Sequence, residues 1–316
     1  MIDKEFARQQ LPEETVSLFD DIVLSRVLGA SKQTNLICRM LSSIMDLNIE
    51  FTEKLNRIEI ITEYFKATRG QNSRAIYNSI SGLMVEIKTL FSDEKNREKI
   101  KFTIDNYQKQ LKDNVDKSAN YAATLCSQFD TIMIFDYSST VESFVGQLKE
   151  KKVIYIPESR ALDGGRPFLK TAVSKGHEVH FIPDTTMLVE LKKCQAAFIG
   201  AETIYPDGSV FNTVGADILA VICKEYNIPL YAISPMVKLD IRNKYGYTKL
   251  APMPFDYSIR LAKGWSEKDK ENIDFRSIKL VKIDAKYITG IITEFGIIPS
   301  YGMYTEALNY NIQIGE

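Results

Sequence analysis

The sequence predicts an α/β fold, in which a helical N-terminal domain is followed by a Rossmann-like, mainly parallel, doubly wound sheet. Two observations lead to this prediction. Through the first 125 residues, apolar side chains recur at every third or fourth position, the spacing of one buried helix face. From residue 130, short apolar runs alternate with helical segments, which is typical of right-handed βαβ units. We therefore expect two domains, a helical domain at 1–125 and a ligand-binding and dimerisation domain at 126–316.

The helical half has an apolar stripe over residues 16–47 that is interrupted at Gly29-Ala30-Ser31. This interruption predicts a break with Ser31 as the amino cap of the next helix. Further stripes predict helices within 58–65, 76–90 and 100–125. The polar stretch 68–72 predicts a loop before a helix that starts near Ser73.

The second half alternates predicted strands with predicted helices. The strands are expected at 131–135, 152–156, 178–182, 196–201, 230–233 and 287–293. The helices are expected at 140–149, 166–175, 186–193 and 214–226. Residues 241–285, which include Trp265, predict a long surface excursion.

Composition excludes several classes of protein. The formal net charge is −1, from 40 basic and 41 acidic residues, so no nucleic-acid or membrane surface is expected for the chain as a whole. The charged amino terminus and the absence of an apolar run of about 18 residues predict a soluble, cytoplasmic protein. Neither GxxxxGK[ST] nor GxGxxG occurs, which argues against a P-loop enzyme or a dinucleotide-dependent oxidoreductase.

Cysteine and histidine usage argues against a metal site. The four cysteines are scattered without CxxC spacing, so we expect reduced, buried thiols. His177 and His180 are three residues apart in a strand-like segment, which places them on opposite faces. We expect no metal and no cofactor.

Polar residues follow the first predicted strand. Asp136 comes directly after it, and Ser138 and Ser139 precede the helix expected at 140–149. Hydroxyls and backbone N–H groups at the amino end of a helix suit a phosphate group. A plain helix cap by Ser139 explains the same residues, so both interpretations stay open.

Two further loops carry cations. Arg160 lies near the pair Gly164-Gly165, where it either clamps an anion or crosses the turn in a salt bridge. Lys238 follows the strand expected at 230–233 and either faces a ligand or is solvated. Because the carboxyl ends of parallel strands meet at one edge of a sheet, we expect these loops to converge.

The stretch GAETIYPDGSVFNTVG, residues 200–215, follows another predicted strand and places Glu202 at its carboxyl end. Asp207-Gly208 predicts a tight turn, and Asn212-Thr213 precedes a helical pattern. Hydroxyls, cations and two carboxylates at one edge predict a pocket for a small phosphorylated ligand, such as a sugar phosphate or a nucleotide.

Three segments carry a family resemblance: PESRALDGGRP (157–167), GAETIYPDGSVFNTVGADILAVICKEYNIPLYAIS (200–234) and ITEFGIIPSYGMYTEAL (292–308). They resemble the family that unites the alpha, beta and delta regulatory subunits of initiation factor 2B with methylthioribose-1-phosphate isomerase and ribose-1,5-bisphosphate isomerase. The helical half matches more loosely, at Gly29-Ala30 and around Arg69. The resemblance implies a ligand pocket between the two domains and a homodimer, or a higher oligomer of dimers.

The resemblance also implies roles for particular residues. Those it implies for ligand binding are Gly29, Ala30, Arg69, Ser138, Ser139, Arg160, Asn212 and Lys238. In the isomerases, a cysteine after the first strand and the aspartate of a Gly-Ala-Asp motif convert an aldose 1-phosphate into a ketose phosphate. Those two positions are Asp136 and Glu202 in this chain. Leu28 and Thr213 stand where the family pattern has an arginine and a lysine.

These departures favour a member of the family without the familiar reaction. A carboxylate is a weaker nucleophile than a cysteine thiolate, and the added methylene of glutamate extends the side chain by roughly 1.5 Å. Misplacement of a reacting group by ~1 Å costs about a hundredfold in rate. We therefore expect an initiation factor 2B regulatory-subunit-like protein that binds a phosphorylated metabolite and acts through subunit association.

Two alternatives belong to other classes. The first is an enzyme, an aldose–ketose isomerase of a sugar phosphate and thus an intramolecular oxidoreductase, with Asp136 and Glu202 as the catalytic acid–base pair. The second is a purely structural scaffold with an occluded pocket.

Overall fold

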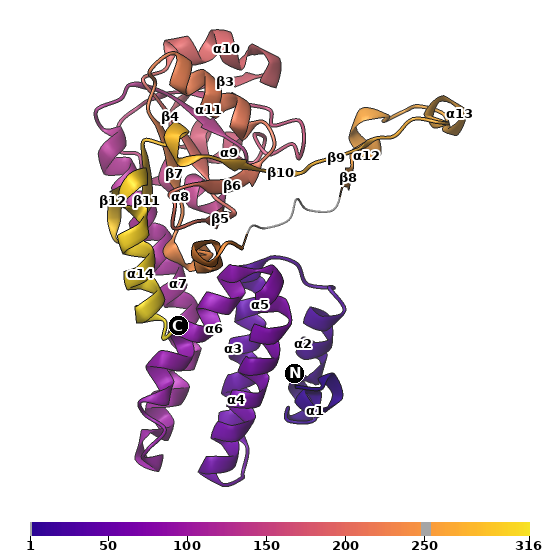
Figure 1. Cartoon of the computed structure of the whole chain (residues 1–316), viewed down its shortest axis with the longest axis vertical. Coiled ribbons are helices and arrows are strands. Elements are labelled where there is room, and N and C mark those ends of the chain that lie inside the picture. Colours follow the sequence, from indigo (N-terminus) through magenta and orange to yellow (C-terminus); the bar gives the residue numbers. More distant parts are fainter. Residues whose placement is uncertain (1, 248–253) are drawn as a thin grey trace. The chain divides into compact units, whose positions relative to one another are not determined.

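The computed structural model describes residues 2–247 and 254–316 (Figure 1). The chain divides into two compact units. The helical unit comprises Met1–Asp113, Val237–Leu239 and Leu308–Glu316, and the sheet unit comprises Asn114–Met236 and Asp240–Ala307. The predicted domain boundary between residues 125 and 126 stays a prediction.

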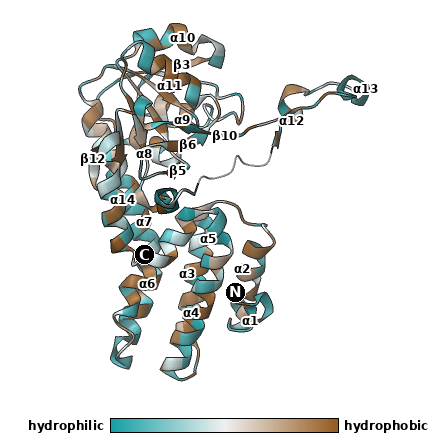
Figure 2. Ribbon diagram, in the orientation of Figure 1, coloured by the Kyte–Doolittle hydropathy of each residue, from teal (hydrophilic) through white to brown (hydrophobic). Residues whose placement is uncertain are grey.

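The helical unit is built from amphipathic helices whose apolar faces share one core (Figure 2). The helices are α1 (Lys4–Arg8), α2 (Glu13–Val23), α3 (Ala30–Asp46), α4 (Phe51–Ala67), α5 (Arg69–Asn72), α6 (Arg74–Lys88) and the first part of α7 (Arg97–Cys126). The rings of Phe19, Tyr64 and Phe65 pack in this core with centroids between 5.1 and 5.4 Å apart. Such aromatic clusters contribute strongly because each ring removes a large apolar area from water.

Two local predictions for this unit are wrong. Helix α3 begins at Ala30 with Gly29 at the cap position, so Ser31 lies inside the first turn and is not the cap. Gly29 has a φ of 95°, a conformation that glycine adopts without steric cost. Residues Arg69–Asn72 form the short helix α5 and not a loop, although Ser73 does precede helix α6 as expected.

The sheet unit contains a seven-stranded, mainly parallel sheet in the order β12-β11-β7-β4-β1-β2-β3. Its strands are β1 (Thr131–Phe135), β2 (Val153–Pro157), β3 (Glu178–Ile182), β4 (Ala196–Gly200), β7 (Leu230–Ile233), β11 (Gly290–Thr293) and β12 (Gly296–Pro299). Only β12, which closes a hairpin with β11, runs antiparallel to its neighbour. Ala119, Ala122 and Cys126 of helix α7 pack into the core of this sheet.

The predicted fold class is confirmed, and the predicted strands lie within a few residues of the observed ones. The helices of the unit include α8 (Ser139–Gln147), α9 (Phe168–Ser174), α10 (Met187–Glu190), α11 (Ala216–Glu225) and the first part of α14 (Met303–Gln313). The continuous helix expected at 186–193 is wrong, because α10 is a single turn between two 3₁₀ segments. Helix α11 starts later than expected, because Gly215 caps it with a φ of 102°.

A second, three-stranded sheet was missed by sequence reasoning. It consists of β5 (Thr203–Ile204), β6 (Val210–Thr213) and β10 (Leu280–Ile283), all paired antiparallel. The predicted turn at Asp207-Gly208 joins β5 to β6, with Gly208 at a φ of 79°. Asn212 and Thr213 therefore end strand β6 and do not directly precede a helix. Strand β10, which pairs with β6, lies in the segment 241–285 that was expected to be a surface excursion.

Another part of that excursion, residues 255–277, forms an arm of the sheet unit (Figure 1), and Ile241–Tyr245 form a 3₁₀ helix. The arm consists of β8 (Phe255–Asp256), α12 (Ser258–Leu261), α13 (Glu267–Lys270) and β9 (Arg276–Ser277). Strands β8 and β9 pair antiparallel at its base, and Trp265 contacts Phe275 edge to face. The part of the predicted excursion at 248–253 lies outside the described residues.

Candidate functional site

The candidate site lies where the strand order reverses. From β1 the chain proceeds outward through β2 and β3, then returns to place β4 on the other side of β1. In open α/β sheets, ligands bind at the carboxyl ends of the two strands that flank such a switch point. The loops after β1 and β4 carry Asp136, Ser138, Ser139 and Glu202, so four predicted residues lie at this position.

Asp136 is held in place by the neighbouring loop. Its side chain is buried, its φ is 57°, and one carboxylate oxygen accepts a hydrogen bond of 2.8 Å from the Ser159 hydroxyl. A left-handed backbone is uncommon for residues other than glycine and marks functional sites more often than ordinary turns. A Cβ atom on Gly164 would lie 2.0 Å from the same carboxylate. Gly164 and Ser159 together therefore fix this acid after β1.

Ser138, and not Ser139, occupies the cap position of helix α8, so the capping interpretation of Ser139 is wrong. The Ser138 side chain makes no capping hydrogen bond. Its hydroxyl oxygen is buried and has no hydrogen-bond partner among the described residues. Ser139 is exposed in the first turn of the same helix. A buried hydroxyl without a partner is unfavourable in the empty site, and a ligand oxygen would satisfy it.

The end of β4 approaches Ser138 closely. A Cβ on Gly200 would lie 2.5 Å from the Ser138 Cβ, so only glycine permits this approach. The Gly200 carbonyl accepts a hydrogen bond of 3.1 Å from the Asn212 amide, whose own oxygen accepts one from the Thr213 backbone N–H. Asn212 is buried and therefore joins β6 to the carboxyl end of β4.

Glu202 differs from Asp136 in its surroundings. Its backbone N–H donates to the Phe211 carbonyl at 2.8 Å, but its side chain is exposed. Within the described part of the chain, its carboxylate makes no hydrogen bond and no ion pair. The structure thus holds one of the two predicted acids firmly and leaves the other in solvent.

Arg160 lies beside Ser159 in the loop after β2. The Asp184 carboxylate accepts from the backbone N–H groups of both residues at 2.8 Å, which ties this loop to the end of β3. The Arg160 guanidinium is half exposed and lies 3.8 Å from the Asp163 carboxylate. An exposed pair of this kind adds about 0–1 kcal/mol, so the guanidinium stays available to an anion.

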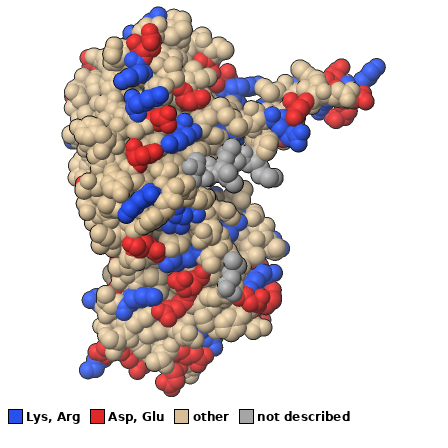
Figure 3. Space-filling view, viewed as in Figure 1, with Lys and Arg blue, Asp and Glu red and all other residues tan. Residues whose placement is uncertain are grey.

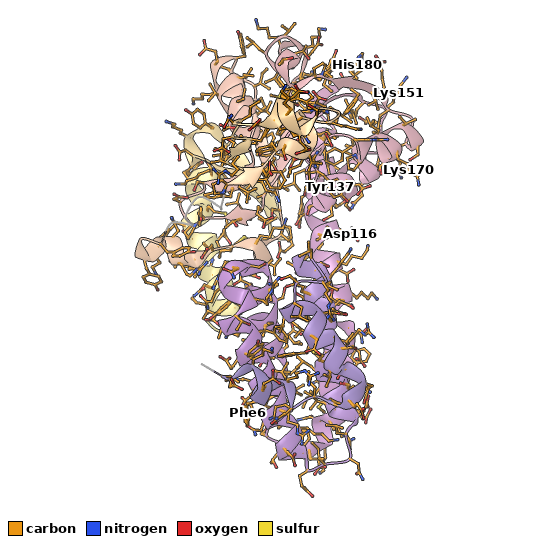
Figure 4. The ribbon with its side chains drawn as sticks, turned by 90° about the vertical axis from the view of Figure 1, so that its right-hand side faces the viewer. Phe6, Asp116, Tyr137, Lys151, Lys170 and His180 are labelled. Atoms are coloured by element: carbon orange, nitrogen blue, oxygen red, sulfur yellow. The ribbon has the colours of Figure 1, made fainter. Side chains whose placement is uncertain are left out.

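The tyrosine between Asp136 and Ser138 contacts Glu142 of helix α8 and Phe168 of helix α9. The Tyr137 hydroxyl donates to Glu142 at 2.8 Å, and this bond, with burial, raises the pKa of Tyr137 to about 12. In Figure 4, Tyr137 lies on the lower side of the sheet unit, where β1 ends, and His180 lies on the upper side. Tyr137 therefore orders the first turn of α8 and is neutral at physiological pH.

Three predicted residues gather within the helical unit. Gly29 and Ala30 form the start of helix α3, and the Gln33 amide donates to the Val27 carbonyl at 2.7 Å. The Arg69 guanidinium donates to the Gln33 side-chain oxygen at 3.2 Å and to the Ser25 hydroxyl at 3.3 Å. Gln33, which sequence reasoning missed, thus joins Arg69 to the amino end of α3.

Lys238 belongs to the segment Val237–Leu239 of the helical unit. The carbonyls of Val237 and Leu239 accept hydrogen bonds of 3.0 and 2.7 Å from the buried Asn78 amide. The backbone on both sides of Lys238 is therefore fixed against helix α6. The role of Asn78 could not be predicted from the sequence, because it is a single polar residue within a helical pattern.

Other buried polar groups lie at the carboxyl ends of β7 and β11. Ser234 is fully buried, and its hydroxyl has no partner among the described residues. Glu294 accepts a hydrogen bond of 2.9 Å from the Met236 backbone N–H. Burial raises the pKa of Glu294, although the hydrogen bond opposes this shift. Both residues were missed because their burial depends on neighbouring strands.

Metal and thiol chemistry find little support in the described parts. In residues 2–247 and 254–316, no group of three or more His, Cys, Asp or Glu side chains is placed to hold a metal ion. The prediction of free, buried cysteines is confirmed, and burial raises the pKa of each thiol to about 12. No helix of the described chain is long and apolar enough to span a membrane. Figure 3 shows basic and acidic side chains interspersed on the face it presents.

Comparison with known proteins identifies the family to which the chain belongs. A model of the initiation factor 2 subunit family matches residues 35–300, which include the loops after β1, β2 and β4. The chain belongs to the initiation factor 2 subunit family. The resemblance noted for the three motif segments is thereby confirmed.

Relatives within the family carry two kinds of name. A Pyrococcus furiosus protein named as translation initiation factor eIF-2B subunit 2-like is 25% identical over 91% of this chain and 97% of its own length. A similarly named protein of Pyrococcus horikoshii is 29% identical, over 57% of this chain and 62% of its own length. The ribose 1,5-bisphosphate isomerase of Thermococcus kodakarensis is 23% identical over 92% of both chains.

Solved structures support the fold. The translation initiation factor eIF-2B structure from Pyrococcus horikoshii superposes with a TM-score of 0.67 at 22% identity, covering 92% of this chain and 98% of that one. A chain of the tetrameric eIF2B-beta2-delta2 complex from C. thermophilum gives a TM-score of 0.68 at 14% identity, covering 97% and 98%. At these identities the likeness establishes the fold.

Proposed function

We propose that this chain is a regulatory-subunit-like member of its family, which binds a phosphorylated metabolite and acts through association with other subunits. The observation that carries the proposal is the buried Ser138 hydroxyl, which has no hydrogen-bond partner among the residues that the structure describes and lies between the ends of β1 and β4. A phosphoryl oxygen at this place would accept from Ser138 and from the free N–H groups at the start of helix α8.

The residues around Ser138 support binding more than catalysis. Asp136 already accepts a hydrogen bond from Ser159, and Glu202 is exposed to solvent. A general acid or base must be held within reach of the reacting carbon. Among the described residues, the exposed Glu202 carboxylate has no hydrogen bond or ion pair that would hold it there. Ser139, Arg160 and Asn212 are proposed to complete the phosphate site or to shape it.

In the helical unit, Gly29, Ala30, Arg69 and Lys238 are proposed as further ligand-binding residues. Arg69 lies at the amino end of helix α3, where an anion is favoured by the free backbone N–H groups and by the helix dipole. A proposed role in subunit association rests on the relatives, since the solved complex from C. thermophilum is named as tetrameric. We expect a homodimer or a higher oligomer of dimers.

Ligand-dependent thermal stabilisation tests the proposal. Ribose 5-phosphate and other sugar phosphates at millimolar concentration should raise the Tm of the wild type. At a ligand concentration of 100 Kd the gain is about 2.7 kcal/mol, or roughly 5–10 °C for a unit of the size of the sheet unit. The gain should shrink in Ser138→Ala and in the Arg160→Ala, Lys238→Ala variant. If the wild type has the same Tm with and without sugar phosphate, it does not bind these ligands and the proposed phosphate site is wrong.

A second candidate function is favoured by the similarity to ribose 1,5-bisphosphate isomerase, which extends over 92% of both chains. In this alternative, Asp136 and Glu202 act as the acid–base pair of an aldose–ketose isomerase. Solvent deuterium incorporation into pentose and hexose phosphates would identify such an activity. Turnover that survives Glu202→Gln would exclude Glu202 from the mechanism, and native mass spectrometry of the purified protein would report oligomeric state and any retained metabolite.

A further inference from the structure

We infer that Glu316 is a positioning residue for Arg69, which it holds in place through a clamp across helix α5. The clamp is formed by three side chains that contact the Glu316 carboxylate, those of Lys66, Tyr77 and Ser81. All of these residues belong to the helical unit. The inference rests on the proposed role of Arg69 in binding a phosphorylated metabolite.

The Glu316 carboxylate joins two helices. One of its oxygens accepts from the Lys66 ammonium at 2.8 Å and from the Ser81 hydroxyl at 2.7 Å, and the other accepts from the Tyr77 hydroxyl at 2.8 Å. Lys66 lies in the last turn of α4, whereas Tyr77 and Ser81 lie one turn apart in α6. The side chains of Lys66 and Glu316 are only 16% and 24% exposed, and hydrogen bonds to charged groups are the strong ones. The carboxylate therefore ties the end of α4 to the start of α6.

The carboxylate of Glu316 is charged at neutral pH. Burial raises its pKa, but the hydrogen bonds from Lys66, Ser81 and Tyr77 outweigh burial, so that the pKa lies below its ordinary value. The clamp is closed wherever this group is ionised.

Helix α5, which begins with Arg69, is the four-residue connection between the two tied helices. A Cβ atom on Gly70 would lie 3.1 Å from the Tyr77 Cβ, so Tyr77 packs directly on the backbone of α5. The Gln71 side-chain amide donates to the Lys66 carbonyl at 3.3 Å. A single helical turn is not stable by itself, so the place of α5 depends on these two neighbours.

The residue that closes the clamp extends from a fixed backbone. Ile314 is buried, and its Cγ2 atom would lie 3.6 Å from a Cβ on Gly82 of α6. Gly315 has a φ of 74°, and the Glu316 N–H donates to the Asn311 carbonyl at 3.0 Å, as is common where a helix ends. Less conformational entropy is lost when a carboxylate on an ordered segment is bound than when one on a flexible segment is bound.

Arg69 is positioned at two levels. Its guanidinium donates to the side chains of Gln33 and Ser25, which orient the tip. The clamp fixes the backbone from which the side chain extends. Because charge-assisted hydrogen bonds require short distances and good alignment, a shift of α5 weakens the contact of Arg69 with an anion.

Amide hydrogen exchange of the full chain, followed by mass spectrometry, tests the clamp without ligand. Glu316→Gln removes the charge with little change of shape. The backbone N–H groups of Gln71 and Ser73, which close the turn of α5, should exchange about tenfold faster in this variant. Lys66→Met should have the same effect, and the double variant should exchange no faster than either single variant, because both changes break one link.

Glu59→Gln is the matched control. Glu59 also joins α4 to α6, through an ion pair of 3.2 Å with Lys88, but it lies two helical turns before the end of α4. This variant should leave the exchange of α5 as in the wild type. Unchanged exchange of α5 in Glu316→Gln, or equal acceleration in Glu59→Gln, would overturn the inference.

Isothermal titration calorimetry with ribose 5-phosphate tests the consequence for Arg69. Glu316→Gln should raise the Kd by about tenfold when Arg69 is present and should leave it unchanged in the Arg69→Ala background, because Glu316 acts through Arg69. Equal effects in both backgrounds would show that Glu316 acts by another route and would overturn the inference. If the wild type binds no ribose 5-phosphate, the proposed function fails, while the exchange of α5 still decides whether Glu316 holds the turn that carries Arg69.

Discussion

Two serine-to-alanine substitutions at the switch point should change stability in opposite directions. Within residues 2–247 and 254–316, the buried Ser138 hydroxyl has no hydrogen-bond partner, whereas the buried Ser159 hydroxyl donates to Asp136 at 2.8 Å. Leaving a polar group buried and unpaired costs about 1–3 kcal/mol, so Ser138→Ala should stabilise the empty protein by about 1 kcal/mol. Ser159→Ala removes a hydrogen bond to a charged group and should destabilise it by about 1.5–3 kcal/mol.

Differential scanning calorimetry without ligand measures both effects. For a unit of this size, 1 kcal/mol corresponds to about 2–4 °C, so Ser138→Ala should raise the Tm by about 2–4 °C and Ser159→Ala should lower it by roughly 3–12 °C. Each change removes one oxygen from a serine at the same site, and therefore each variant is the control for the other. If Ser138→Ala destabilises the protein as much as Ser159→Ala does, the hydroxyl of Ser138 has a partner in solution and the reasoning fails.

Three other predictions concern the sheet unit. Gly164→Ala should lower the free energy of unfolding, measured with denaturant, by about 1–3 kcal/mol, because the added Cβ would overlap the Asp136 carboxylate. Gly146→Ala in helix α8, where the nearest atom to the added Cβ is 3.8 Å away, should raise it by about 0.4–1 kcal/mol. Equal effects of the two substitutions would contradict the packing around Gly164. Burial raises the pKa of Glu294 in the folded protein. The wild type therefore loses free energy of unfolding as the pH rises through that pKa and the carboxyl group ionises. Glu294→Gln stays neutral, so its stability relative to the wild type should increase from pH 4 to pH 8. An advantage that shrinks with pH would show that the hydrogen bond from Met236 outweighs burial. The four thiols, with a pKa of about 12, should resist a thiol reagent at pH 8 until the protein unfolds, and rapid labelling of the native protein would contradict their burial.

The sequence predicted the main sheet well because its strands are short apolar runs buried on both faces. Strands β1, β3 and β7 have the residues that the pattern indicated. The three-stranded sheet escaped, since β5 has two residues and β6 four, all buried, and neither alternates in hydrophobicity. Local pattern does not identify such strands, because β5 pairs only with β6, and the other partner of β6, strand β10, lies about 70 residues away along the chain.

The candidate site was predicted only in outline. That Asp136 and Ser138 follow a strand and precede a helix can be read from the sequence. Their different hydrogen-bonding states cannot be read from it, because Ser159 reaches Asp136 from the loop after β2, 23 residues further along the chain. The cap of helix α8 also moved by one residue from the prediction, and that shift decides which hydroxyl is buried.

The contrast between the two acids bears directly on the choice between binding and isomerisation. Proton transfer between adjacent carbons requires an acid–base group that is held within reach of both carbons. The Glu202 side chain is exposed and has no hydrogen bond or ion pair among the described residues, whereas Asp136 is buried and accepts a hydrogen bond from Ser159. A phosphate ester needs only donors at this position, and the Ser138 hydroxyl, which has no partner among the described residues, supplies one, so the proposal of binding without conversion rests on Ser138 and not on the two acids.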